Sequence, residues 1–143
     1  METQRITDAL LKMPYYNAGP IYRGIHVPNA VADRFLQDYQ AGTRHSFGIL
    51  QSFSSREDVA ESFGVWNAVY GHTTSIKFVL QGNKTAPSTV HISHFGYLES
   101  EVLSPHIQEF EVLRAEVESG AQGHRRITFY LEDRTKRKGR RSK

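Results

Sequence analysis

The chain has 143 residues with 18 Lys and Arg, 15 Asp and Glu, a formal net charge of +3 and no cysteine. Its length suits a single domain with its own core, and the lack of cysteine excludes disulfides, thiolate chemistry and cysteine-ligated zinc. No apolar run approaches the length of a transmembrane helix, and the first residues contain no apolar region typical of a secretory signal. We therefore expect a soluble protein, or a soluble domain cut from a larger one.

The positive charge is concentrated at one end of the chain. Residues 134–143 carry seven of the 18 basic side chains and no acidic one, so the first 133 residues hold 11 basic against 15 acidic side chains. The body therefore has a net charge of about −4 and the tail one of +7. We predict one domain over residues 1–133, followed by a basic tail over residues 134–143 that is disordered in isolation.

The first elements combine a short helix and a strand. Ile6, Leu10 and Met13 have helical spacing, and Pro14 follows them, which predicts a helix over residues 6–13. Residues 21–27 alternate as a strand, and Arg23 lies on its apolar face. A buried arginine needs a partner, but an arginine at a sheet margin can also extend its charged group to water. The local sequence leaves both readings open.

Two further helices are predicted before the chain becomes strand-rich. Asn29 is a candidate N-cap for a helix that ends near Gln40 and Gly42. A strand over residues 47–53 follows, and Ser55 with Asp58 resembles a capping box for the next helix. The later apolar segments predict strands at residues 74–80, 89–92, 101–103, 110–117 and 125–131. This order of elements predicts an α+β fold with mostly antiparallel sheets.

Candidate functional residues gather near two strand ends. Glu99 and Glu101 are two residues apart, so an extended chain would project both carboxylates to one side, with Cβ atoms roughly 6–7 Å apart. Ser52 and Ser54 have the same spacing at the end of an earlier strand. His91 and His94 face opposite ways in the predicted structure, so we expect no metal site there. Phosphate-loop, nucleophile-elbow and zinc-protease motifs are missing from the sequence.

The ordered set of motifs resembles a known enzyme family. The segments are Ile-Tyr-Arg-Gly at 21–24, Gln-Ser-Phe-Ser-Ser at 51–55, Gly-Tyr-Leu-Glu-Ser-Glu-Val-Leu at 96–103 and Phe-Glu-Val at 110–112. Together they resemble the Arg-Ser-Glu class of mono-ADP-ribosyltransferases, which includes cholera- and iota-type toxins and arginine-specific vertebrate ectoenzymes. The resemblance covers roughly residues 20 to 131. It implies two packed, mostly antiparallel sheets with flanking N-terminal helices and an NAD cleft between the sheets.

The resemblance also implies catalytic roles. Glu101 would hold the ribose of NAD and face the positive charge of an oxocarbenium-like transition state. Glu99 would orient or deprotonate the acceptor, and a Glu at this place goes with arginine as the acceptor in the family. Arg23 would bind the NAD phosphates.

Further positions are implied for NAD and for the acceptor. The Gly24 backbone would meet the nicotinamide amide, and Tyr97 would contact the acceptor. The serine motif of the family matches either residues 52–54 or residues 54–56, and strand alternation favours Ser52 and Ser54, with Ser54 bonding the catalytic Glu. Phe63 or Trp66 would stack on nicotinamide, although the helical spacing of Phe63 also suits a core position.

The expected activity is transfer of ADP-ribose from NAD, with no metal, to a macromolecule. Protein arginine is the first candidate acceptor, and RNA, contacted by the basic tail, is the alternative. A non-catalytic binding domain with a degenerate NAD site is a third reading. The setting would be a phage-encoded modifier or a toxin or effector module with an immunity protein, acting in the cytoplasm or delivered into the cytoplasm of a target cell.

Overall fold

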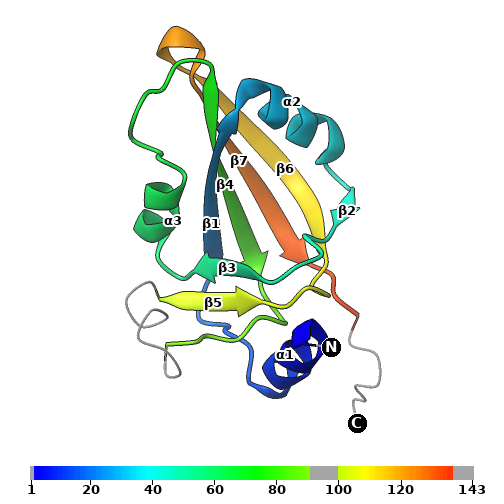
Figure 1. Ribbon diagram of the computed structural model, residues 1–143. Coiled ribbons are helices and arrows are strands. Elements are labelled where there is room, and N and C mark those ends of the chain that lie inside the picture. The colour runs from blue at the N-terminus through cyan, green and yellow to red at the C-terminus, as the bar shows by residue number, and fades with distance from the viewer. Residues whose placement is uncertain (1, 91–99, 137–143) are drawn as a thin grey trace.

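The computed structural model describes residues 2–90 and 100–136 (Figure 1). The helices in these ranges are α1 (Glu2–Lys12), α2 (Asn29–Asp38), α3 (Glu57–Phe63) and the 3-10 turn η1 (Ala121–Gly123). The strands are β1 (Ile21–Pro28), β2 (Arg44–His45), β3 (Gln51–Ser54), β4 (Thr73–Gly82), β5 (Glu101–Ser104), β6 (Phe110–Ser119) and β7 (Arg125–Asp133). The predicted α+β class is confirmed.

The seven strands form one sheet in the order β2-β6-β7-β4-β1-β3-β5. All neighbouring pairs are antiparallel except β4 and β7, which are parallel. The two expected sheets are thus two parts of a single curled sheet. β1 and β3 share only the pair Tyr22 and Ser54, and beyond it β3 and β5 run across the ends of the long strands (Figure 1).

An aromatic core fills the space inside the curl. Phe53 of β3 lies 6.1 Å from Phe110 of β6 between ring centroids, and Phe47 lies within 6.4 Å of both. Phe78 and Phe129 stack at 5.6 Å in the long strands, and α2 packs on them. Because such rings bury large apolar areas, this cluster explains how a chain of modest hydrophobic content holds the two parts of the sheet together.

The strand β1 presents different faces to the core and to α3. Ile21 is fully buried in the core, as the sequence alternation predicts. On the opposite face α3 approaches Gly24 so closely that a Cβ atom there would lie 1.8 Å from the Ala60 carbonyl oxygen. Only a glycine fits at this contact, since real Cβ atoms do not come within 3 Å of such an atom. The position of α3 therefore depends on Gly24.

Lys77 fixes α3 from the neighbouring strand. It pairs with Gly24 across β1 and β4, and its Nζ lies 2.7 Å from carboxylate oxygens of both Glu57 and Glu61 and 4.2 Å from the centre of the Trp66 ring. Burial alone would lower the pKa of Lys77, but the hydrogen bonds and charges of the two glutamates outweigh it, and the pKa is raised. The ammonium group stays charged and ties both turns of α3 to the sheet.

Three local predictions are wrong. The helix α3 begins at Glu57 with Arg56 before it and no side-chain cap, so Ser55 and Asp58 do not form a capping box. Asn29 does not cap α2, because its side chain accepts from Thr74 Oγ1 and donates to the Gly123 carbonyl. The predicted strand at 47–53 is reduced to residues 51–54, since the chain first pairs with β6 through β2 and then turns.

The segments around the sheet were predicted in part. The first helix is α1, with Leu10 buried and Ile6 partly exposed. The strand expected at 89–92 is represented by a single bridge between Ser88 and Val102, and residues 91 and 92 lie outside the described residues. None of the helices in the described ranges is long and apolar enough to cross a membrane.

Gly24→Ala is the sharpest test of this packing. The added methyl group meets backbone rather than a movable side chain, so we expect a loss of roughly 1–3 kcal/mol or more in the free energy of unfolding, measured by urea denaturation. Gly19→Ala is the control, because a Cβ at Gly19 meets no atom within 4 Å. Equal stabilities of the two variants would contradict the close contact between α3 and β1.

Candidate functional site

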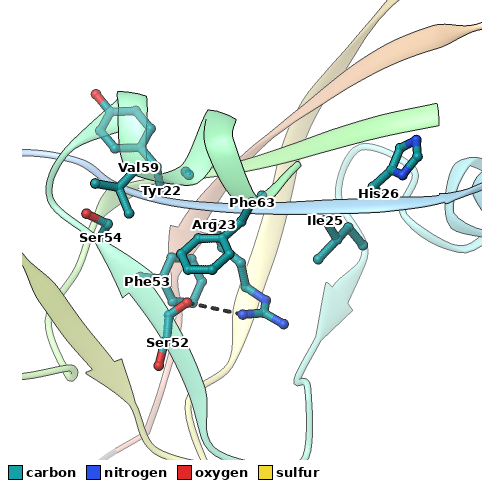
Figure 2. A pocket seen from close by; sticks show the side chains of 11 residues that line it. Tyr22, Arg23, Ile25, His26, Ser52, Phe53, Ser54, Val59 and Phe63 are labelled. Atoms are coloured by element: carbon teal, nitrogen blue, oxygen red, sulfur yellow. Dashed lines mark hydrogen bonds between the residues drawn. The ribbon is translucent and has the colours of Figure 1, made fainter. Parts of the chain in front are cut away.

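A cavity of about 460 Å³ lies where β1 and β3 diverge, with α3 beside it (Figure 2). Residues 22–26 of β1, residues 52–54 of β3, and Val59, Ala60 and Phe63 of α3 line it. Its volume is in the range of small-molecule sites. Since the two strands pair only once, at Tyr22 and Ser54, the fork between them is open to a ligand.

Arg23 is the cationic group of this cavity. Its Nη1 donates to the Ser52 carbonyl at 3.1 Å, and its guanidinium lies 5.9 Å from the centre of the Phe47 ring. Among the residues that the structure describes, no carboxylate forms an ion pair with it. Burial lowers the pKa of Arg23, yet an arginine stays protonated in proteins. The half-buried charge is thus available to an anion.

Gly24 and Phe63 lie on the same cavity, and Trp66 does not. Phe63 is 57% exposed, so the core position that its helical spacing also suited is excluded. Trp66 instead lies beside two cations, with Lys77 Nζ 4.2 Å and the Arg126 guanidinium 5.2 Å from its ring centre. Of the two aromatic candidates, Phe63 is the one that a ligand in the cavity can reach.

The strand register brings Glu101 to the serines. Glu101 pairs with Ser54 and Leu103 with Ser52, so Ser52 is the diagonal neighbour of Glu101 on one face of the sheet. The Ser52 hydroxyl donates a short hydrogen bond to Glu101 Oε2. Sequence reasoning favoured Ser54 for this bond. Ser54 is buried, and its Oγ accepts the backbone N–H of Arg56 at 3.0 Å.

Two predicted site residues cannot be placed. Glu99 and Tyr97 lie outside the described residues, as does most of the basic tail. Of the predicted set, the structure brings Arg23, Gly24, Ser52, Ser54 and Phe63 to one cavity and attaches Glu101 to it through Ser52. Within residues 2–90 and 100–136, no group of His, Asp and Glu side chains could hold a metal ion.

Two polar residues near the site were not found from the sequence. Thr89 Oγ1 donates to Glu101 Oε1 at 2.7 Å, and His26 lines the cavity with its Nε2 2.9 Å from Thr73 Oγ1. Both contacts depend on strand pairing between distant segments. The alternation of β1 places His26 and Gly24 on one face and could have indicated His26, whereas no sequence motif marks Thr89.

Comparison with protein-family models and with curated proteins finds no match. Solved structures do match. The ADP-ribosyltransferase Vis from Vibrio splendidus, in complex with agmatine, aligns with a TM-score of 0.63 and 22% identity over 90% of this chain and 55% of its own. The ADP-ribosyltransferase HopU1 of Pseudomonas syringae aligns with a TM-score of 0.58 and 20% identity over 91% of this chain and 48% of its own.

Exoenzyme S from Pseudomonas aeruginosa, in complex with human 14-3-3 protein beta and bound to Carba-NAD, aligns with a TM-score of 0.60 and 20% identity. The match covers 98% of this chain and 62% of that one. The chain therefore spans about half to three-fifths of the length of these structures. The likeness shows that this protein has the fold of the ADP-ribosyltransferases, as its motifs predicted.

Arg23→Gln tests whether the cavity binds an anion. Loss of charge-assisted hydrogen bonds should weaken the binding of ADP-ribose by about 10- to 100-fold, measured by calorimetry. Arg114→Gln is the matched control, because Arg114 is exposed on β6 and stacks on Tyr130. Equal affinity in the two variants would contradict the assignment of Arg23 as the anion-binding group.

Proposed function

We propose that this protein is a mono-ADP-ribosyltransferase that cleaves NAD and transfers ADP-ribose to protein arginine. The observation that carries the proposal is the cavity between β1 and β3. It contains Arg23, which has no carboxylate partner among the described residues, and it connects through Ser52 to the Glu101 carboxylate. The shared fold supports it, since Exoenzyme S with this fold is described bound to Carba-NAD. A cavity that contains one cation, with a carboxylate joined to it through Ser52, suits a substrate that carries a diphosphate and develops positive charge elsewhere.

The residues that line the cavity support a position for NAD. Arg23 binds the diphosphate, because its planar fork of N–H donors matches phosphate oxygens. The nicotinamide ring lies against the backbone of Gly24 and against Phe63, whose exposed ring offers a stacking surface. Phe53 and Val59 add apolar side chains to the lining of the cavity.

Glu101 supplies the charge that the reaction needs. The nicotinamide of NAD is already cationic at its glycosidic nitrogen, so it departs with the bonding electron pair and without a general acid. The ribose then develops oxocarbenium character, which a nearby carboxylate stabilises. With Oε2 bonded to the Ser52 hydroxyl, the Glu101 carboxylate holds a ribose hydroxyl and faces the charged carbon.

Arginine is the proposed acceptor because of Glu99 and Tyr97. One guanidinium nitrogen attacks the ribose carbon as the bond to nicotinamide breaks, and the proton it loses passes to Glu99. Tyr97 contacts the acceptor. The neighbour Vis is described in complex with agmatine, a guanidinium compound, which supports a site for arginine on this fold.

The proposed setting is a toxin or effector module, or a phage-encoded modifier, that acts on cytoplasmic proteins. HopU1 comes from Pseudomonas syringae and Exoenzyme S from Pseudomonas aeruginosa, and Exoenzyme S is described with a human protein partner. An immunity protein is the expected partner of a toxin. Among the described residues no feature favours RNA as the acceptor, so RNA remains the alternative.

Glu101→Gln tests the catalytic assignment. The amide keeps the size of the side chain but loses the charge, so transfer of labelled ADP-ribose from NAD should fall by about 10²–10³-fold in a cell lysate. Glu118→Gln is the control, because Glu118 is an exposed acid of β6 outside the cavity. Undiminished labelling by Glu101→Gln would contradict the catalytic role of Glu101.

The same labelling reaction identifies the class of the acceptor when one half of the sample is treated with protease and the other half with nuclease before the label is detected. Label that protease removes and nuclease spares supports a protein acceptor. Label that follows the nucleic acid would replace protein with RNA. A wild-type protein that neither binds nor cleaves NAD would show instead that the fold serves a non-catalytic binding domain.

Glu99→Gln separates acceptor handling from NAD cleavage. Arginine modification should be lost, because the proton of the guanidinium has no base, while slow NAD hydrolysis should remain near the wild-type rate. The two rates are measured with agmatine as acceptor and with water alone. Parallel loss of both rates would mean that Glu99 acts on NAD rather than on the acceptor.

A further inference from the structure

Both oxygens of the Glu101 carboxylate accept a hydroxyl proton. Ser52 donates to Oε2 and Thr89 Oγ1 donates to Oε1 at 2.7 Å. The two donors come from two different segments that pair with β5, since Ser52 is on β3 and Thr89 follows Ser88, which bridges to Val102. A carboxylate bonded at one oxygen can still rotate about that bond, whereas one bonded at both has a fixed plane.

The backbone fixes the position of Thr89. Its N–H donates to the Glu101 carbonyl at 2.9 Å, the N–H of Leu103 donates to the Pro87 carbonyl at 2.9 Å, and Ser88 bridges to Val102. The segment 87–89 thus lies along β5 as a short edge. Thr89 is only 2% exposed, so water does not compete for its hydroxyl and the side chain has little freedom to turn away.

We propose that Thr89 is a positioning residue that sets the orientation of the Glu101 carboxylate for reaction. This inference rests on the proposed function of Glu101. Because Thr89 is buried, it acts through Glu101 and does not touch the substrate. Ser52 lines the cavity and is exposed, so a ligand can disturb its bond to Glu101. The bond from Thr89 persists when a substrate is bound.

Thr85 provides a matched control four residues away. It is 1% exposed, and its Oγ1 donates at 2.8 Å to Asp133 Oδ2, in a polar cluster with Asn83 and Gln108 that lies outside the cavity. Thr85→Val therefore removes the same kind of buried hydroxyl-to-carboxylate bond without touching Glu101. A purely structural role of Thr89 would make the two valine variants alike.

The experiment compares Thr89→Val, Thr89→Ser and Thr85→Val by steady-state kinetics of NAD cleavage and by thermal unfolding. Thr89→Val should lower kcat by about 10- to 100-fold, the effect of one hydrogen bond to a charged group, with KM for NAD little changed. Thr89→Ser keeps the hydroxyl and should restore kcat to near the wild-type value. Thr85→Val should lower Tm and leave kcat unchanged.

Several outcomes would overturn the inference. Thr89→Val with a lower Tm and the wild-type kcat would reduce Thr89 to a structural residue, and failure of Thr89→Ser to restore activity would show that the hydroxyl is not the group that matters. If Thr89→Val does not fold, Thr89→Ala removes the hydroxyl without adding a methyl group in its place. A wild-type kcat in Thr89→Ala would then overturn the inference.

A second readout does not depend on activity. The carboxyl carbon of Glu101 is observed by NMR in protein labelled at the glutamate side chains and assigned with Glu101→Gln. Its resonance should move in Thr89→Val and stay in place in Thr85→Val. If the wild type neither binds nor cleaves NAD, the proposed function fails while this comparison still decides whether Thr89 orders Glu101. An unmoved resonance in Thr89→Val would contradict the inference.

Discussion

The close contact between α3 and the bare backbone of β1 at Gly24 decides the geometry of the cavity. Because nothing projects from β1 at this position, Ala60 can lie against the strand, and Lys77 then holds the helix by two ion pairs. The helix carries Phe63 to the cavity at its last turn. A side chain at position 24 would displace the helix and the ring together.

The divergence of β1 and β3 opens the cavity, and Ser52 of β3 contacts both Arg23 and Glu101 there. After the single pair Tyr22 and Ser54, β3 leaves β1 and pairs with β5. The register of β3 with β5 then sets Ser52 diagonal to Glu101. A shift of one residue would turn every side chain of β3 to the opposite face and would remove the Ser52 hydroxyl from the carboxylate. The pairing of the β3 and β5 backbones thus fixes the contact between Ser52 and Glu101 more than the serine motif does.

Sequence patterns predicted the elements whose periodicity is strong. The alternation of β1 placed Ile21 in the core, and the long strands β4, β6 and β7 were found close to their observed bounds. Capping signals at Asn29 and Ser55 failed, because tertiary partners such as Thr74 and Gly123 satisfy the Asn29 side chain instead. Local propensity cannot anticipate a hydrogen bond to a segment that is 45 or more residues away.

In the site, too, the sequence predicted residues that belong to motifs and missed contacts between distant segments. Arg23, Gly24, Ser52 and Ser54 were predicted from ordered motifs, and the structure brings them to one cavity. The contact of Lys77 with the Trp66 ring and the hydrogen bond from Thr89 to Glu101 depend on how strands pair across the sheet. No spacing in the sequence encodes these contacts, since each joins residues whose neighbours are set only by the curl of the whole sheet.

The most direct measurement is a crystal structure of this protein soaked with Carba-NAD. The account predicts the diphosphate within hydrogen-bond distance of the Arg23 guanidinium, the nicotinamide between Gly24 and Phe63, and a ribose hydroxyl on the Glu101 carboxylate. Carba-NAD bound elsewhere on the surface, or a cavity still empty at saturating ligand, would contradict the claim that the fork between β1 and β3 is the NAD site.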